Sequence, residues 1–126
     1  MSSGQWEKLQ SIADAEVQAT MKSLPQHLRE EARQLPVTYE PRPNPAMMTD
    51  GTEPDTLGLF VGPEFSESES GRGTLPPQII LFLENLSEFA DEDETIFRQE
   101  IRTTLLHELG HYLGLDEGDL EERGLE

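Results

Sequence analysis

The sequence contains no cysteine, and this excludes several kinds of site at once. Disulfide bonds, thiolate ligands for a metal and cysteine nucleophiles all require a thiol. A metal bound by this chain must therefore be held by histidine, carboxylate or water. Nitrogen ligands are scarce as well, because the only histidines are His27, His107 and His111.

Positive charge is also scarce. Lys and Arg together number 9 against 26 for Asp and Glu, and the formal net charge is −17. Affinity for nucleic acid depends on clustered cations, and anionic membrane surfaces attract basic segments. We therefore expect no nucleic-acid partner and no membrane partner. The acidic excess is compatible with cationic peptide substrates, but it also favours solubility, so it does not identify a substrate.

Long hydrophobic runs are missing too. The longest apolar run, residues 79–83, is far too short to cross a bilayer. Residues 1–6 lack the basic and apolar regions of a secretory signal. At 126 residues the chain has the length of one domain, so we expect a single domain over 1–126 and a cytoplasmic location. Nothing in the sequence specifies an oligomeric state.

Apolar spacing predicts a mixture of helices and short strands. Helices are expected over Ser3–Ser23, Gln26–Leu35 and Thr95–Leu113, with a helical turn over Asn85–Ala90. Strands are expected over Val37–Tyr39, Thr56–Val61 and Gln78–Leu83. The prolines at 41, 43 and 45 predict an extended loop after the first strand. The expected fold class is α+β: a compact fold with N-terminal helices, a small mixed sheet of about three or four strands, and a long helix near the C-terminus.

The strongest chemical signal lies on the last predicted helix. Residues 107–111 read His-Glu-Leu-Gly-His, which is the pattern H-E-x-x-H. One helical turn separates His107 from His111, so both imidazoles project from one face and can reach a single Zn²⁺. Glu108 lies beside that face, where it can take a proton from a metal-bound water. The pattern predicts metal ligands at His107 and His111 and a catalytic base at Glu108.

A catalytic zinc usually has a third protein ligand besides water. His27 is the remaining histidine, but a surface or capping role suits it better. Carboxylates follow Gly114, a glycine that can end the helix and let the chain turn back towards the metal. Glu117 is the preferred candidate, and Asp116 is the alternative.

These residues resemble a known family pattern. The segment from His107 to Glu117 matches H-E-x-x-H-x-x-G-x-x-(H/D/E), the arrangement of metzincin-type metallopeptidases, with Glu117 at the third ligand position. More closely, the chain is similar to the small bacterial zincin-like metallopeptidases. Shared features are a Leu-Pro helix break at 24–25, a strand over 57–60, Leu-Pro-Pro at 75–77 and the form of residues 103–111.

The resemblance implies a compact zincin-like α+β fold with a zinc-loaded helix and a peptide or protein substrate. Two features depart from the pattern. The family usually has aspartate where this chain has Glu117, and metzincins carry a methionine turn after the zinc helix. Only nine residues follow Glu117 here, and none of them is methionine.

The expected function is that of a zinc-dependent metallopeptidase, with the predicted strand Gln78–Leu83 as a candidate for substrate binding by strand addition. One alternative is a metal-dependent endoribonuclease of the ribosomal-RNA maturation type, whose motif H-x3-H-x5-H ends in histidine where this chain has Glu117. The other is a non-catalytic zinc-binding domain, against which the intact Glu108 argues. Peptide deformylases share H-E-x-x-H but use a cysteine ligand, which this chain lacks.

Overall fold

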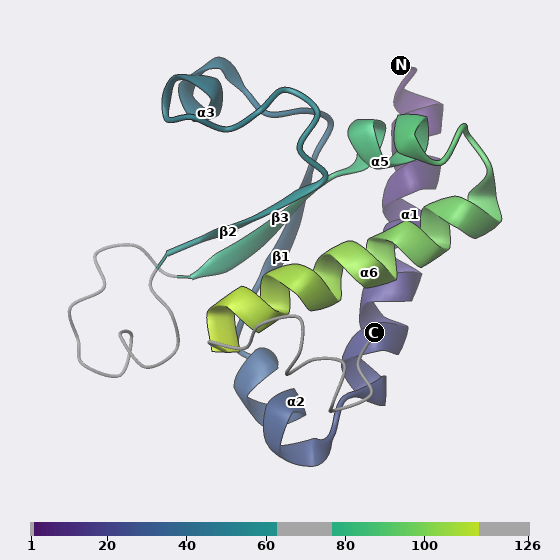
Figure 1. Cartoon of the computed structure of the whole chain (residues 1–126). Coiled ribbons are helices and arrows are strands. Elements are labelled where there is room, and N and C mark those ends of the chain that lie inside the picture. The colour runs from purple at the N-terminus through teal and green to yellow at the C-terminus, as the bar shows by residue number, and fades with distance from the viewer. Residues whose placement is uncertain (1, 63–76, 114–126) are drawn as a thin grey trace.

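The computed structural model describes residues 2–62 and 77–113, and these form helices packed on a small sheet (Figure 1). In chain order the described elements are α1 (Ser3–Ser23), α2 (Gln26–Ala32), β1 (Val37–Glu40), α3 (Pro45–Thr49), β2 (Gly58–Val61), β3 (Gln78–Phe82), α5 (Leu83–Phe89) and α6 (Glu94–Leu113). The expected α+β class, with a long last helix, is confirmed.

The first helix shows how local signals set its bounds. Ser2 caps α1 by accepting a hydrogen bond from the Gln5 backbone N–H (3.2 Å), and the Gln5 side chain accepts one from the Ser2 backbone N–H (3.0 Å). This capping box satisfies donors that the first helical turn leaves free. Pro25 follows the C-terminal end of the helix, where another helical turn cannot continue. The predicted and observed bounds of α1 agree.

The sheet has the strand order β1-β3-β2. β1 runs parallel to β3, with Val37 opposite Ile79, and β2 runs antiparallel to it, with Gly58 opposite Leu81. Residues 79–82 of β3 are all buried, as a central strand covered on both faces must be. The prediction of a small mixed sheet is confirmed.

One face of the sheet is covered by α6, and α1 packs on α6. α6 packs against β2, β3, α1 and α5, and Figure 1 shows it crossing in front of the sheet with α1 beside it. The core contains Ile79 and Leu81 from β3, Ile101 and Leu105 from α6, and Val17 from α1, all of them buried. The last helix is therefore a central element of the core.

Besides shifts of one or two residues at other element ends, two details differ from the sequence prediction. The proline-rich stretch expected to be an extended loop contains α3, whose first residue is Pro45 and whose N-cap is Asn44. Asn44 Oδ1 accepts a hydrogen bond from the Met47 backbone N–H (2.8 Å), which stabilises a first turn. α2 ends at Ala32, three residues before the predicted end at Leu35.

Within residues 2–62 and 77–113, no helix is long and apolar enough to cross a membrane.

Candidate metal centre

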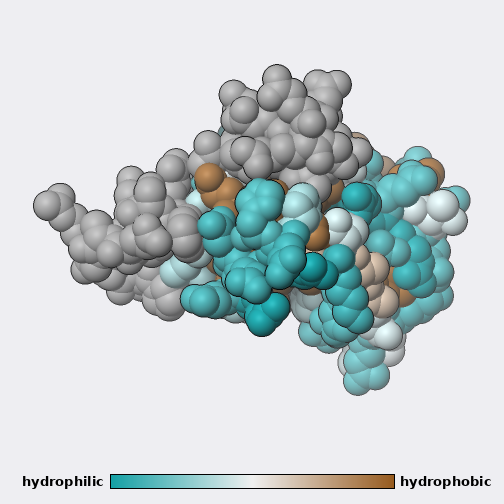
Figure 2. All heavy atoms as spheres, turned by 90° about the horizontal axis from the view of Figure 1, so that it is seen from below, coloured by the Kyte–Doolittle hydropathy of each residue, from teal (hydrophilic) through white to brown (hydrophobic). Residues whose placement is uncertain are grey.

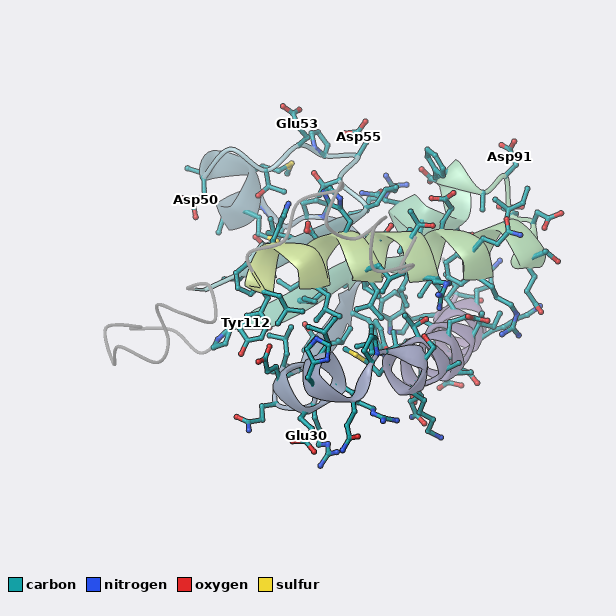
Figure 3. The ribbon with its side chains drawn as sticks, turned by 60° about the horizontal axis from the view of Figure 1, so that its bottom comes forward. Glu30, Asp50, Glu53, Asp55, Asp91 and Tyr112 are labelled. Carbon is teal, nitrogen blue, oxygen red and sulfur yellow. The ribbon has the colours of Figure 1, made fainter. Side chains whose placement is uncertain are left out.

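The helix that carries the motif is fixed at its start and along its length. Asp93 Oδ1 accepts a hydrogen bond from the Ile96 backbone N–H (3.0 Å), which caps α6. The two residues at the turn before it, Asp91 and Glu92, have positive φ angles of 52° and 60°, which reverse the chain after α5. Figure 3 shows Asp91 beyond this end of α6 and Tyr112 at the other. The motif therefore lies on a rigid, core-packed element.

Both motif histidines lie on the exposed side of α6. Their ring centroids are 4.7 Å apart, with the ring planes inclined at 64°, and the His111 side chain is 53% exposed. Two nitrogens bound to one Zn²⁺ lie at most about 4.2 Å apart, twice the bond length. Neighbouring imidazoles at this spacing can meet that requirement. The pair fits a metal that prefers nitrogen ligands.

Glu108 lies between the two histidines in sequence but is buried, with 6% of its surface exposed. Its Oε2 atom lies 3.3 Å from Nδ1 of His111 but lacks the alignment of a hydrogen bond, and no other described atom bonds to it. Burial raises the pKa of the Glu108 carboxyl above its usual range, and the charge of His107 opposes that rise. A carboxylate with an open acceptor atom therefore lies beside the histidine pair.

Gly58 allows β2 to approach the buried side of the motif. A Cβ atom at this position would lie 2.5 Å from Cγ2 of Thr104 and 3.5 Å from Cγ of Glu108. The first distance is far inside van der Waals contact, so any larger residue here would require a shift of the Thr104 side chain or of the backbone. The close approach of the β2 backbone covers Thr104 and Glu108.

Tyr112 continues this contact one turn further along α6. Its ring lies against that of Phe60 in β2, with centroids 5.7 Å apart and planes inclined at 53°. Tyr112 is 5% exposed, and Phe60 is partly buried against the same core. This aromatic pair, together with the contact at Gly58, fixes the position of β2 on the helix.

The predicted third ligand cannot be placed, because Glu117 and Asp116 lie outside the described residues, as does Gly114. Among residues 2–62 and 77–113, no three His, Asp or Glu side chains are grouped so that they could hold a metal ion. The remaining histidine, His27, is exposed on α2 and is not brought together with His107 and His111. The structure therefore assembles two of the predicted ligands and the predicted base.

Sequence reasoning missed the polar network that leads into β2. Asn85 of α5 is 5% exposed, and its Nδ2 donates to the backbone carbonyls of Pro54 (2.8 Å) and Thr56 (2.9 Å). Its Oδ1 accepts a hydrogen bond from Nη1 of Arg42 (3.1 Å), which also pairs with Glu84 and Glu88. These partners are 29 to 46 residues apart in sequence, so no local pattern indicated them. Gly58 did carry a signal, because a glycine within a strand pattern often marks a close backbone approach.

Comparison with known families gives one matching family. The profile of the zincin-like metallopeptidase family matches residues 32–125, which is 94 of the 126 residues. No individual curated protein matches the chain. The matched span contains the whole sheet, α6 and the H-E-x-x-H motif. The chain therefore belongs to the zincin-like metallopeptidase family, and membership of this family implies a bound metal, typically zinc.

Proposed function

We propose that this protein is a zinc-dependent metallopeptidase that hydrolyses peptide bonds with Glu108 as its catalytic base. The observation that carries the proposal is the position of Glu108, a buried carboxylate with an open acceptor atom 3.3 Å from an imidazole nitrogen. A carboxylate left without a hydrogen-bond donor costs stability, and such a group is retained where chemistry uses it.

The zinc ligands in this proposal are His107, His111 and Glu117, with Asp116 as the alternative third ligand. The paired imidazoles on the exposed face of α6 support the first two assignments. The match of Glu117 to the third ligand position of the motif supports the last. Zinc, when bound, supplies a Lewis acid that polarises the scissile carbonyl and makes the attacking water more acidic.

Glu108 handles the proton in this scheme. Its carboxylate accepts a proton from the attacking water and then delivers that proton to the leaving amine nitrogen. Burial raises the pKa of Glu108, which makes its carboxylate a better proton acceptor than an exposed glutamate. The packing of β2 against Thr104 holds the helix face from which Glu108 projects.

The strand prediction for substrate binding needs correction. β3, which covers the predicted Gln78–Leu83, is the central strand and is paired on both edges, so it cannot accept a further strand. In the described part of the chain β2 is an edge strand, and it lies directly on α6. We therefore assign β2 as the strand beside which an extended peptide binds.

The central test compares wild type with Glu108→Gln for zinc content and for cleavage of a broad peptide library. We expect Glu108→Gln to retain zinc and to lose about 10²–10⁴-fold in cleavage rate, the range typical of general acid–base catalysis. Glu7→Gln, an exposed change on α1 with the same chemistry, should leave both measurements unchanged. Equal cleavage by wild type and Glu108→Gln would disprove the role of Glu108.

Zinc stoichiometry tests the ligands separately. His107→Ala and His111→Ala should lose zinc, whereas His27→Ala should keep it. Between Glu117→Ala and Asp116→Ala, the variant that loses zinc identifies the third ligand. Wild-type protein that binds zinc but cleaves nothing in the library would instead be a non-catalytic zinc-binding domain.

A further inference from the structure

A pocket lies among α1, α2 and β1, away from the H-E-x-x-H motif. Its volume is about 470 Å³, within the range of roughly 300–1,000 Å³ typical of small-molecule sites. The apolar part of its lining includes Val17, Ala32 and Leu35, which are buried, and Met21, which is half-buried. No residue of α6 lines it. Figure 2, which views the molecule from the α2 side, shows a mainly hydrophilic described surface interrupted by small hydrophobic patches.

Three cations also line this pocket, namely Lys22, Arg29 and Arg33. This is a third of the nine Lys and Arg residues in a chain with a net charge of −17. Within the described residues none of the three forms an ion pair. By contrast, Arg42 pairs with two glutamates of α5, and Arg98 pairs with two glutamates on α1 and α6. Five of the described cations therefore form no ion pair with a described carboxylate, and three of these five line the pocket.

Helix geometry explains part of this arrangement. Lys22 lies in the last turn of α1 and Arg29 in the last turn of α2, where a helix dipole stabilises positive charge. Arg33 is the C-cap of α2. Dipole stabilisation accounts for a cation at each helix end, but it does not require the cations to converge on one apolar pocket. Glu30 on the same helix points away from the molecule (Figure 3).

Asp14 is the one carboxylate among the described residues that line the pocket, and it is already engaged. Oδ1 of Asp14 accepts a hydrogen bond from the hydroxyl of Tyr39 (3.2 Å), and Oδ2 accepts one from Nε2 of Gln18 (3.2 Å). Burial and the neighbouring Asp14 raise the pKa of Tyr39 well above its usual range, so its hydroxyl keeps the proton that it donates. Asp14 is thus held by neutral donors, and no carboxylate of residues 2–62 and 77–113 pairs with the three cations.

We propose that this pocket binds a small amphipathic anion, a carboxylate attached to an aliphatic or aromatic body. The apolar body would cover Val17, Met21 and Leu35, and the carboxylate would be neutralised by Lys22, Arg29 and Arg33. Burial of the apolar body supplies affinity, while the cations select the charge of the ligand. This site is separate from the proposed metal centre, and the inference does not depend on peptidase activity.

The test uses the full chain, decanoate as the anion and decyltrimethylammonium as a cation with the same tail, each below its micelle concentration. Calorimetry in excess EDTA should show saturable binding of decanoate, weakened by added salt, and no comparable binding of the cation. Amide NMR shifts of the wild-type protein should concentrate at residues 17–22, 29–35 and 37–39. The shift map requires no variant, so it stands even if a variant folds poorly.

A charge-matched pair of variants sharpens the result. Arg29→Gln/Arg33→Gln should weaken decanoate binding at least tenfold, because both changes remove cations at the pocket. Lys8→Gln/Arg102→Gln removes the same net charge from residues that do not line the pocket and should leave the affinity within about twofold. Equal losses in both variants would mean that bulk charge governs binding, and would overturn the proposal.

Three other outcomes would also overturn it. Equal binding of decanoate and the decyl cation would show only non-specific apolar contact. Binding that disappears in EDTA would place the carboxylate on the metal. Shifts at this pocket with an acidic, leucine-containing peptide but none with decanoate would identify a protein segment as the occupant instead.

Discussion

Two buried polar side chains on neighbouring helices have opposite surroundings. Asn85 of α5 is 5% exposed and makes three hydrogen bonds, two as donor and one as acceptor. Glu108 of α6 is 6% exposed, and among the described residues one of its oxygens accepts no hydrogen bond. A satisfied buried group stabilises a fold, whereas an unsatisfied one costs stability. The comparison separates a residue kept for structure from one that we propose is kept for chemistry.

The hydrogen bonds of Asn85 also help to position the strand that covers Glu108. Asn85 holds the carbonyls of Pro54 and Thr56 just before β2 begins at Gly58. Gly58 then meets the side chains of Thr104 and Glu108 on α6. The polar network therefore sets where β2 enters its contact with the motif helix.

The largest expected effect on stability comes from removing the hydrogen-bonded side chain of Asn85. Asn85→Ala removes three hydrogen bonds and leaves two backbone carbonyls without their donor. Each unsatisfied buried group costs about 1–3 kcal/mol, so we expect a loss of about 3 kcal/mol in the free energy of unfolding. Urea denaturation of the metal-free protein measures it.

Asn44→Ala is the matched control for this change. Asn44 caps α3 through one exposed hydrogen bond to Met47, and loss of a cap costs about 1 kcal/mol. If Asn85→Ala cost no more than Asn44→Ala, the buried network would contribute nothing beyond an ordinary cap.

The next effect concerns the contact that joins the two regions. Gly58→Ala places a methyl group 2.5 Å from Cγ2 of Thr104, and overpacking of this kind costs about 2 kcal/mol. Thr104→Ser deletes that Cγ2 atom and keeps the hydroxyl. The double variant should therefore be more stable than the sum of the two single changes predicts, by about 1 kcal/mol. Thermal or urea unfolding of the four proteins gives this coupling directly.

Gly4→Ala supplies the comparison for a glycine with free space around it. Nothing lies within 4 Å of a Cβ at Gly4, and alanine favours a helix, so this change should stabilise by less than about 1 kcal/mol. Additive effects of Gly58→Ala and Thr104→Ser would mean that the strand does not rest on Thr104.

The features that the sequence predicted well depend on nearby residues. The bounds of α1 follow from a capping serine, a helical period and Pro25, all within one segment. The histidine pair follows from the geometry of one helical turn. α3 was missed because its prolines suggested an extended loop, although Asn44 before Pro45 is a recognisable helix start.

The features that could not be predicted depend on distant residues. Asn85 finds its partners about 30 to 45 residues away, and its side chain carries no pattern that specifies them. The burial of Glu108 follows from the approach of β2 across the sheet, which the motif alone does not encode. The sequence therefore indicated which groups we propose for the chemistry, but not the packing that shifts the pKa of Glu108.

The smallest expected effect on stability comes from replacing Glu108, the buried side chain with an unsatisfied oxygen. Because burial raises the pKa of Glu108, the folded protein favours its protonated form, and the group destabilises the fold once it must ionise. Glu108→Gln should therefore stabilise the metal-free protein by on the order of 1 kcal/mol at neutral pH. The gain should shrink as pH falls towards the ordinary glutamate value of about 4.3, where the unfolded chain also binds the proton. Thr20→Val removes the other described buried side-chain oxygen that lacks a hydrogen bond, but that hydroxyl does not titrate in this range. The effect of Thr20→Val on the free energy of unfolding should be the same at pH 5 and pH 8. If the effect of Glu108→Gln were equally independent of pH, ionisation of the Glu108 carboxyl would not destabilise the fold.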